Sequence, residues 1–407
     1  MNKIKKIINE FNYIKVKDFL QIFVFLFSIP ISLIYRLVNG RKKEIWLVCE
    51  DEKEARDNGY CFFKYLNNEH PEILSYYAIN YKTKDYDKVK KIGRTVRYGS
   101  LKHWVLYFNA KYNISSQKAG KPNAAICYVL EVYGIIKSKS IFLQHGITIN
   151  KATWLFYENT KIRLFVCGAK PEYEYVKQEF NYPKENVKYL GFCRFDDYHN
   201  ITVNKNQILL IPSWREWLTV KNEYSKKYEV DNDFTKTEYY KKYQELLNNE
   251  QLQNLLEEKN LIIYFYPHRN MQKYIDKFST KSDRIKIVNN QNSEIRDLLI
   301  ESAVMITDYS SVGMDFAYMK KPVIYYQFDE KKFREAQYQK GYFDYRKSGL
   351  GQVCNNCDEI VKLVENLYLT NFEITEQFKK AHKKFFELYD NKNNERIFNA
   401  IREIWKT

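Results

Sequence analysis

Two histidines directly follow apolar runs that are typical of buried strands. His145 and Gly146 follow one such run, and His268 and Arg269 follow another. Ligands of open parallel sheets bind just outside the carboxyl ends of the strands. A histidine there can take the proton of an attacking hydroxyl, and an arginine offers a permanent cationic fork to phosphate oxygens. We therefore predict that His145 is a general base and that His268 and Arg269 face a phosphate. The alternatives are a hydrogen-bonded structural histidine and ordinary surface residues.

A pair of serines follows a third apolar run, at 303–307. Ser310 is predicted to cap the helix that begins after it, which would leave backbone N–H groups of the first turn facing an anion. The hydroxyls of Ser310 and Ser311 would add hydrogen bonds to a phosphate. Asp315, one turn further on, is predicted to reach a ribose diol. Ordinary helix capping explains one of the serines but not the whole arrangement.

Short apolar runs alternate with amphipathic stretches from Glu44 onward, which predicts parallel sheets covered by helices and an α/β class. The predicted strands are 44–49, 75–79, 112–115, 140–144, 164–167, 187–190, 207–211, 261–265, 285–288, 304–307 and 322–326, and two of the predicted helices are 58–67 and 124–132. A polar stretch at 196–205 predicts a division into two α/β halves. A basic helix is predicted at 374–405, and the charged stretch 221–238 is predicted to be an exposed loop.

The charge balance indicates an anionic partner. Lysine and arginine total 66 against 50 acidic residues, a formal charge of 66 − 50 = +16. Such a field favours nucleic acid, an acidic membrane or a phosphorylated substrate, and charge alone does not choose among them. The 36 tyrosines and 26 phenylalanines are spread along the chain and form no stacking motif for nucleic acid. A non-enzymatic protein that binds an anionic polymer remains an alternative.

The N-terminal segment predicts contact with a membrane. Residues 19–35 contain no charged side chain, and basic residues stand on both sides of them. The run is short for a spanning helix, and Pro30 interrupts it. We expect a segment that lies in one leaflet with its lysines on anionic headgroups. A single membrane span and a helix buried in the protein are the alternatives.

We predict that neither the cysteines nor the acidic pairs form a metal centre. Seven scattered cysteines form no disulfide framework and fit a reducing compartment. Cys354 and Cys357 form a lone CxxC pair, which we interpret as two free thiols on a surface loop. The acidic pairs at 85/87 and 231/233 lie in lysine-rich stretches and are predicted to be solvated charge.

Taken together, several stretches in order resemble the CDP-glycerol glycerophosphotransferase family of teichoic-acid and capsule polymerases. The stretches are Asp57-Asn58-Gly59 with Phe62–Leu66, Gln144-His145-Gly146, Gly191–Asp196, Ile211–Arg215, Ile306–Ser311, and Lys321–Ile324 with Phe343-Asp344. The resemblance runs from about Lys42 to Arg402. It implies a GT-B fold, with a membrane-associating segment at 1–43, an acceptor domain at 44–200, a CDP-donor domain at 201–371, and a C-terminal helix within 372–407 that packs back on the first domain.

The resemblance also implies a reaction. A polyol phosphate, glycerol phosphate foremost, would pass from a CDP-linked donor to the terminal hydroxyl of a lipid-linked or polymeric acceptor, with release of CMP. The donor is a substrate, and no cofactor, metal or nucleic acid is implied. Such enzymes are peripheral proteins at the cytoplasmic face of the cell membrane, on an anionic lipid surface.

Residue roles carry over by position. His145 matches the family's His-Gly histidine and His268 its second essential histidine, which with Arg269 would face the donor pyrophosphate. Ser310 and Ser311 match the donor-phosphate serines.

Three further positions take implied roles at the donor. Asp315 corresponds to the ribose position, and Gly146 and Arg215 fall on the donor-binding side. The residues after Gly146, 147–151, depart from the Thr-Pro-Leu-Lys of many members. This departure leaves the acceptor and the transferred group open. A GT-B glycosyltransferase that uses a UDP- or CMP-activated sugar is the alternative.

Overall fold

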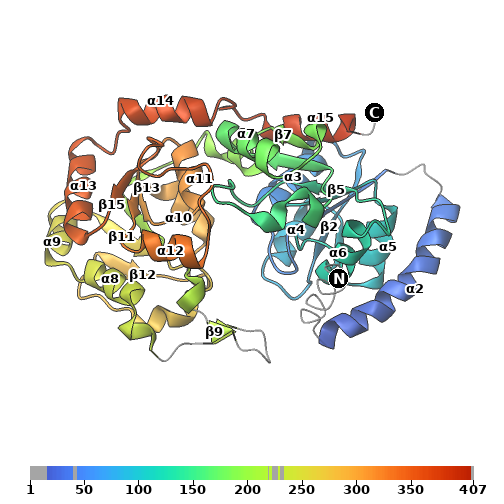
Figure 1. The fold of residues 1–407 in the computed structure, drawn as a ribbon, viewed down its shortest axis with the longest axis horizontal. Helices are drawn as coiled ribbons and strands as arrows, with labels where there is room; N and C mark the ends of the chain where they lie inside the picture. Colours follow the sequence, from blue (N-terminus) through green and yellow to red (C-terminus); the bar gives the residue numbers. More distant parts are fainter. Residues whose placement is uncertain (1–15, 40–43, 219, 222–227, 230–232, 405–407) are drawn as a thin grey trace. The chain divides into compact units, whose positions relative to one another are not determined.

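The computed structural model describes residues 16–39, 44–218, 220–221, 228–229 and 233–404, which divide into two compact units (Figure 1). Unit 1 takes in the chain up to His145, Thr153–Asp196, and the chain from Leu388. Unit 2 takes in Gly146–Ala152 and Asp197–Glu387. Each unit has its own parallel sheet, so the predicted α/β class is confirmed.

Unit 1 is built on a parallel seven-stranded sheet with the order β3-β2-β1-β4-β5-β6-β7. The strands are β1 (Ile45–Cys49), β2 (Leu74–Ile79), β3 (Thr95–Arg97), β4 (Tyr112–Ser115), β5 (Ser140–Phe142), β6 (Leu164–Cys167) and β7 (Val187–Tyr189). The helices between them are α3 (Asn58–Glu69), α4 (Tyr86–Ile92), α5 (Leu101–Asn109), α6 (Ala124–Val132) and α7 (Lys170–Glu179). The strands are nearly all buried, as parallel strands with covered faces must be.

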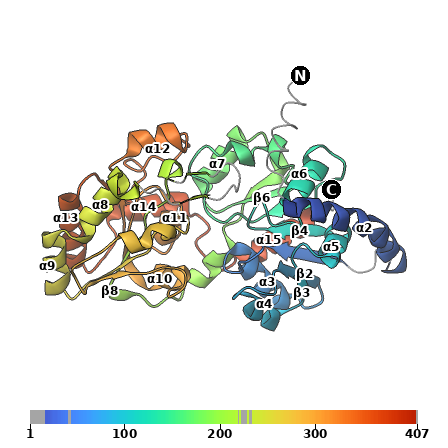
Figure 2. The ribbon, with the colours of Figure 1, turned by 90° about the horizontal axis from the view of Figure 1, so that it is seen from below.

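Unit 2 is built on a parallel six-stranded sheet with the order β12-β11-β8-β13-β14-β15. The strands are β8 (Asn204–Leu210), β11 (Ile262–Phe265), β12 (Ile285–Ile287), β13 (Ser302–Thr307), β14 (Val323–Tyr326) and β15 (Gln352–Cys354). The helices are α8 (Glu238–Leu247), α9 (Glu250–Glu258), α10 (Ile295–Glu301), α11 (Val312–Tyr318), α12 (Glu330–Ala336), α13 (Cys357–Leu369) and α14 (Glu376–Phe385). Helices α9 and α13 pack side by side (Figure 2). A separate antiparallel pair joins β9 (Val220–Lys221) and β10 (Tyr228–Glu229).

Short 3-10 turns complete the connections. They lie at Thr153–Leu155, Tyr157–Asn159, Lys184–Asn186, Cys193–Tyr198, Glu216–Leu218, Phe234–Lys236 and Gln272–Lys277.

Helix α2 (Val16–Asn39) runs unbroken through Pro30 and lies along α5 (Figures 1 and 2). The side chain of Gln21 accepts a hydrogen bond from Trp104 Nε1 at 3.0 Å and donates one to the carbonyl of Gly99 at 3.0 Å. Eleven residues further along α2, the Ser32 carbonyl accepts a hydrogen bond from the side chain of Asn109 at 3.3 Å. The helix is therefore fastened to unit 1 at two places along its length. The flanking basic residues below 16 and at 41–43 lie outside the described residues.

The chain after 372 forms two helices in place of the single helix predicted at 374–405. Helix α14 belongs to unit 2, and α15 (Asn393–Glu403) belongs to unit 1, where it packs on α3. Phe398 of α15 stacks on His70 at a ring distance of 3.7 Å. Residues 386–392 connect the two helices, and the side chain of Asp390 accepts a hydrogen bond from the backbone N–H of Lys392 at 3.0 Å just before α15 begins. Residues 405–407 lie outside the described residues.

Three smaller predictions placed residues at the surface that the structure buries. Cys354 and Cys357 are not surface thiols; both are buried, in β15 and at the start of α13. Phe234, in the stretch predicted to be an exposed loop, is buried and stacks on Tyr274 at 3.9 Å. Asp87 and Asp233 are exposed as predicted, but Asp85 is not solvated: it is buried and accepts a hydrogen bond from the backbone N–H of Ala55 at 2.9 Å. Asp231 lies outside the described residues.

Candidate functional site

The residue before His145 has a left-handed backbone. Gln144 has φ +58°, a conformation that costs a side-chain-bearing residue about 1–2 kcal/mol. Strained backbone of this kind persists only where the surroundings hold it, and it concentrates at functional sites. Strand β5 ends just before it, so the turn lies at the carboxyl edge of the unit 1 sheet.

Buried side chains hold this turn from two sides. Asn58, the first residue of α3, donates to the carbonyls of Gln144 at 2.7 Å and of Leu143 at 3.2 Å. The Gln144 side chain donates to the Val166 carbonyl at 2.6 Å and to Glu172 Oε1 at 3.0 Å. Asn58, Gln144 and Glu172 are all buried, whereas His145 is exposed. The turn therefore presents the imidazole at the surface on a fixed backbone.

Gly146, the next residue, lies in unit 2 and packs against Ser311. A Cβ added at Gly146 would stand 2.8 Å from Ser311 Oγ, closer than real Cβ contacts come. A side chain at this position would force the Ser311 hydroxyl to move, because the Gly146 backbone approaches it directly. Two predicted motifs that are far apart in sequence, Gly146 and Ser310-Ser311, therefore meet, and His145 is bonded directly to the first of them.

The carboxyl ends of three adjacent strands meet at one edge of the unit 2 sheet. Strand β8 lies between β11, which His268 follows, and β13, which Ser310 and Ser311 follow. Two strand spacings separate β11 from β13, or about 10 Å. The backbone N–H of His268 donates to the Pro212 carbonyl after β8 at 3.1 Å, and Asp308 after β13 accepts from the N–H of Ser213 at 2.9 Å. The loops after all three strands are thus joined.

His268 is a neutral imidazole in this environment. Burial, together with the neighbouring Arg269 cation, lowers its pKa to about 4. The backbone N–H of Asn270 donates to Nδ1 at 3.2 Å, which assigns the ring proton to Nε2. The ring is therefore uncharged in the ligand-free protein at neutral pH. A neutral ring can still donate one hydrogen bond from Nε2, and the exposed Arg269 supplies the cation.

The serine loop caps α11 differently from the prediction. Ser311, not Ser310, occupies the cap position, and its side chain makes no cap hydrogen bond. The Ser310 hydroxyl instead accepts from the N–H of Val312 at 3.3 Å. Both serines are partly exposed at the edge of the unit 2 sheet.

Arg215 is not available to a ligand, which corrects its predicted place in phosphate binding. It is fully buried, and its guanidinium pairs with Asp329 at 2.8 Å and with Asp308 at 2.9 Å. Asp308 in turn accepts from Ser213 Oγ at 2.6 Å and from the N–H of Tyr309 at 2.6 Å. Arg215 therefore neutralises the carboxylates that shape the loop leading to the serines, because an unpaired buried carboxylate would be costly.

Asp315 is also placed away from solvent, which corrects the expectation that it meets a ribose. It is buried on α11, where the hydroxyl of Tyr198 donates to Oδ1 at 3.3 Å. Within the part of the chain that the structure describes, no group of three or more His, Cys, Asp or Glu side chains is arranged to hold a metal ion.

Sequence reasoning missed the residues that hold the His145 turn. Asn58 lies in a quoted motif but had no role assigned, and Glu172 has no motif around it. The one sequence signal was Asn58 itself, a polar residue at the start of an otherwise amphipathic helix. Its partners lie 85 and 86 positions away, so spacing gave no indication of the contact.

Comparison with known proteins identifies the family of the chain. The profile of the family described as CDP-Glycerol:Poly(glycerophosphate) glycerophosphotransferase matches residues 31–403. The minor teichoic acid biosynthesis protein GgaB of Bacillus subtilis is 36% identical over 373 residues, which cover 89% of this chain and 40% of that protein. The chain thus spans less than half the length of that relative.

Solved structures share the fold. The wall teichoic acid polymerase TagF superimposes with a TM-score of 0.66 at 17% identity, over 97% of this chain and 99% of that one. A putative UDP-N-acetylglucosamine 2-epimerase from Listeria monocytogenes superimposes with a TM-score of 0.55 at 13% identity, over 90% and 97%. On the strength of the profile match over nearly its whole length, the chain belongs to the CDP-glycerol:poly(glycerophosphate) glycerophosphotransferase family.

Proposed function

We propose that this chain transfers a polyol phosphate, foremost glycerol phosphate, from a CDP-linked donor to the terminal hydroxyl of a teichoic-acid-like or capsular acceptor, and releases CMP. Family membership supports the reaction class. The observation that carries the site is the close approach, within unit 2, of Gly146 to Ser311 of the predicted donor-phosphate loop. Gly146 directly follows His145 in the chain.

In the proposed mechanism His145 is the general base. It takes the proton of the acceptor hydroxyl as the oxygen attacks the phosphorus that carries the polyol, and CMP departs from the opposite side. Charge spreads over the phosphoryl oxygens in such a reaction, so catalysis is largely positioning and cationic stabilisation. An exposed imidazole on a fixed turn suits this role, since its proton can leave to solvent after transfer.

The donor pyrophosphate is assigned to the edge of the unit 2 sheet. Arg269 supplies positive charge, and neutral His268 donates from Nε2. The hydroxyls of Ser310 and Ser311 add hydrogen bonds. A bound dianion would raise the pKa of His268, because it favours the protonated ring. The site then becomes more cationic only when the donor is present.

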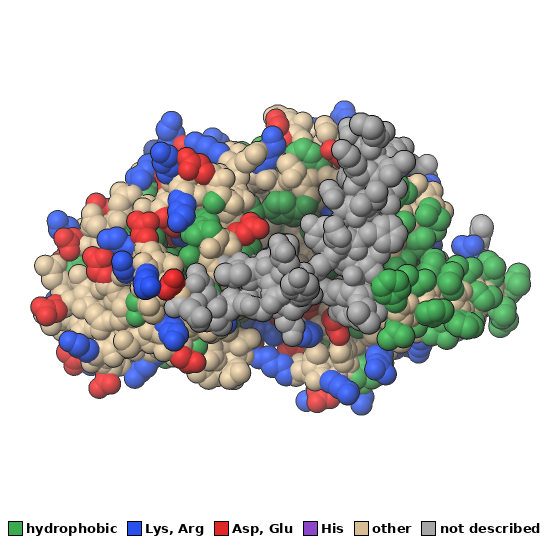
Figure 3. All heavy atoms as spheres, turned by 60° about the horizontal axis from the view of Figure 1, so that its bottom comes forward, with side chains coloured by type: hydrophobic (Ala, Val, Ile, Leu, Met, Phe, Trp, Pro, Cys, Tyr) green, Lys and Arg blue, Asp and Glu red, His purple; other side chains and the backbone are tan. Residues whose placement is uncertain are grey.

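Helix α2 is proposed to hold the protein at a membrane surface. Within the described residues it is the one helix, over Phe19–Asn39, whose length and composition would allow it to cross a bilayer. It exposes a row of large apolar side chains, which Figure 3 shows as a hydrophobic band (Phe19, Leu20, Phe23, Leu26, Phe27, Leu33, Ile34 and Leu37). The hydrogen bonds that Gln21 and the Ser32 carbonyl form with the rest of unit 1 favour a helix that lies in one leaflet, because a spanning helix would lose them.

The test is a donor screen. The protein is incubated with CDP-glycerol, CDP-ribitol and UDP-sugars and with a lipid-linked acceptor; nucleotide release is measured, and the product is analysed by phosphorus NMR. A new phosphodiester together with CMP supports the proposal. A glycoside product with released UDP would instead establish the glycosyltransferase alternative.

A further inference from the structure

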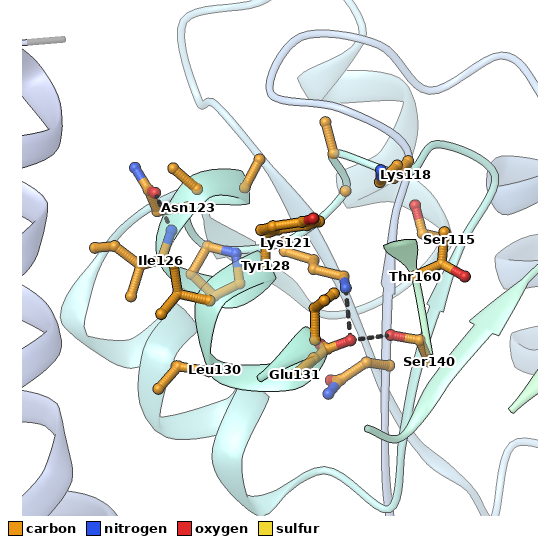
Figure 4. Close-up of a pocket in the computed structure, with 18 of the residues that line it drawn as sticks. Ser115, Lys118, Lys121, Asn123, Ile126, Tyr128, Leu130, Glu131, Ser140 and Thr160 are labelled. Carbon is orange, nitrogen blue, oxygen red and sulfur yellow. Dashed lines mark hydrogen bonds and ion pairs between the residues drawn. The ribbon is translucent and has the colours of Figure 1, made fainter. Parts of the chain in front are cut away.

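A large cavity lies in unit 1, in a part of the molecule to which the proposed chemistry assigns nothing. Its volume is 1530 Å³, above the about 300–1,000 Å³ usual for drug-sized ligands. Helix α6, strands β4 and β5 and the loop 117–123 form most of its wall, and three residues of α2 complete it (Gln21, Ile22 and Phe25). Figure 4 shows the α6 side of this wall.

The acidic residue of α6 in the wall is already satisfied by its neighbours. Glu131 is buried and accepts from Lys121 at 2.8 Å and from Ser140 at 3.1 Å (Figure 4). It also accepts from Ser138 at 2.9 Å, and the Tyr107 hydroxyl donates to its other oxygen. A carboxylate with this many donors offers little to a polar ligand. The remaining wall of α6 is apolar, which favours a hydrocarbon occupant.

Exposed apolar side chains stand along the cavity. Val129 is 42% exposed, Ile135 64% and Trp154 47%, and all three line it. Large apolar side chains in water are informative when they gather beside a cavity, since they mark a binding surface. They extend the apolar wall outward toward solvent.

Helix α2 connects this wall to the proposed membrane surface. Ile22 and Phe25 line the cavity, while Phe23 and Phe27 of the same helix are exposed, at 61% and 68%. One helix thus presents apolar groups both to the cavity and to the outside.

A cation lies in the same wall. Lys118 donates to the Trp154 carbonyl at 3.0 Å, and its ammonium group lies 5.3 Å from the ring centre of Tyr128. A phosphate headgroup needs positive charge beside its hydrocarbon chain, and this residue supplies it.

We propose that the cavity binds the long hydrocarbon chain of a lipid phosphate, with Lys118 near the phosphate. Under the proposed function, on which this part of the inference rests, the chain is the tail of the lipid-linked acceptor. The tail would hold the acceptor in unit 1, the unit that carries His145.

The test combines binding with transfer. A photoreactive polyprenyl phosphate in phosphatidylglycerol vesicles is cross-linked to the full chain, and the labelled peptides are mapped. Ala125→Trp fills the cavity from α6, and Val129→Asp places a charge at its exposed edge. Ala336→Trp, at an exposed position on α12, is the matched control. Transfer is measured to a lipid-linked acceptor and to the same acceptor without its lipid.

We expect labels in 117–133 and 153–162. Labelling should fall at least tenfold in both cavity variants but not in the control. The KM for the lipid-linked acceptor should rise about tenfold in Ala125→Trp, while transfer to the lipid-free acceptor stays at the wild-type rate. Chain binding without any transfer would support the cavity and refute the proposed function.

Two results would overturn the cavity assignment. One is equal labelling of the wild-type protein and Ala125→Trp while transfer proceeds. The other is labelling that appears only after residues 1–15 are removed, because the chain's own N-terminal segment would then be the occupant.

Discussion

Replacing Asn58 by alanine should separate the placement of His145 from the stability of the fold. The substitution removes the donors to the carbonyls of Leu143 and Gln144 and the acceptor that Asn58 Oδ1 offers to the N–H of Arg194 at 3.1 Å. Asn58 is fully buried, so no water replaces these bonds directly. Each buried polar group left without a partner costs about 1–3 kcal/mol.

The expected loss of stability follows from these three hydrogen-bonding groups that lose their partner. Because the three losses share one site and are not additive, we expect unfolding to become about 3 kcal/mol easier. For a unit of this size that corresponds to a fall in Tm of about 6–12 °C. The left-handed turn at Gln144 also loses its support and relaxes, and a shift of about 1 Å at a catalytic group costs about 10²-fold in rate.

The assay is CMP release at a temperature well below the Tm of the variant, alongside thermal denaturation and donor binding. Turnover should fall about 10- to 100-fold while CDP-glycerol binding persists. Asn67→Ala is the matched control, because Asn67 lies on the same helix and donates to Phe63 at 2.8 Å and Ser75 at 3.2 Å without touching the turn. It should lower Tm and leave turnover unchanged. Full turnover in Asn58→Ala, or an equal loss in Asn67→Ala, would refute the positioning argument.

Three further predictions follow from unit 2. Arg215→Met should lower the free energy of unfolding, measured with denaturant, by about 3–5 kcal/mol, because it leaves Asp308 and Asp329 buried and unpaired. Unchanged stability with a raised KM for the donor would indicate that Arg215 binds the donor phosphate after all. The pKa of His268 is lowered to about 4, below its unfolded value of 6.5, so its contribution to the stability of the fold is full above pH 6.5 and is lost as the pH falls toward 4. NMR titration of the ligand-free protein should find the imidazole neutral at pH 6. An imidazole that is protonated at that pH would contradict the assignment. Gly146→Ala should lower turnover about tenfold, because the new methyl group presses on Ser311 Oγ. The double variant Gly146→Ala/Ser311→Ala should lose less turnover than the two single losses combined. Strict additivity in that double-mutant cycle would mean that the two positions do not interact.

The buried strands and helices could be predicted closely from the sequence. Strand β4 and helix α6 have the predicted bounds, because each combines a clear apolar pattern with flanking polar residues. The edge strands β3 and β15 were not predicted. Each is three residues long and partly exposed, so neither carries a continuous apolar run.

The site was harder to predict than the fold. His268, Ser310 and Ser311 do follow strands of one sheet, with β8 between those two strands, as the runs of apolar residues ahead of them indicated. Arg215 was misplaced because a cation after a strand looks the same in sequence whether it faces a ligand or a buried pair of carboxylates. Only the three-dimensional contacts distinguish the two.

The central claim is that His145 is the general base of a phosphotransfer reaction, and that residues other than His145 bind the donor. The most direct measurement is single-turnover release of CMP from CDP-glycerol by His145→Ala, paired with calorimetric donor binding by the same variant. The account predicts a rate loss of about 10²–10⁴-fold with donor affinity within a factor of two of wild type. Turnover near the wild-type rate would contradict it.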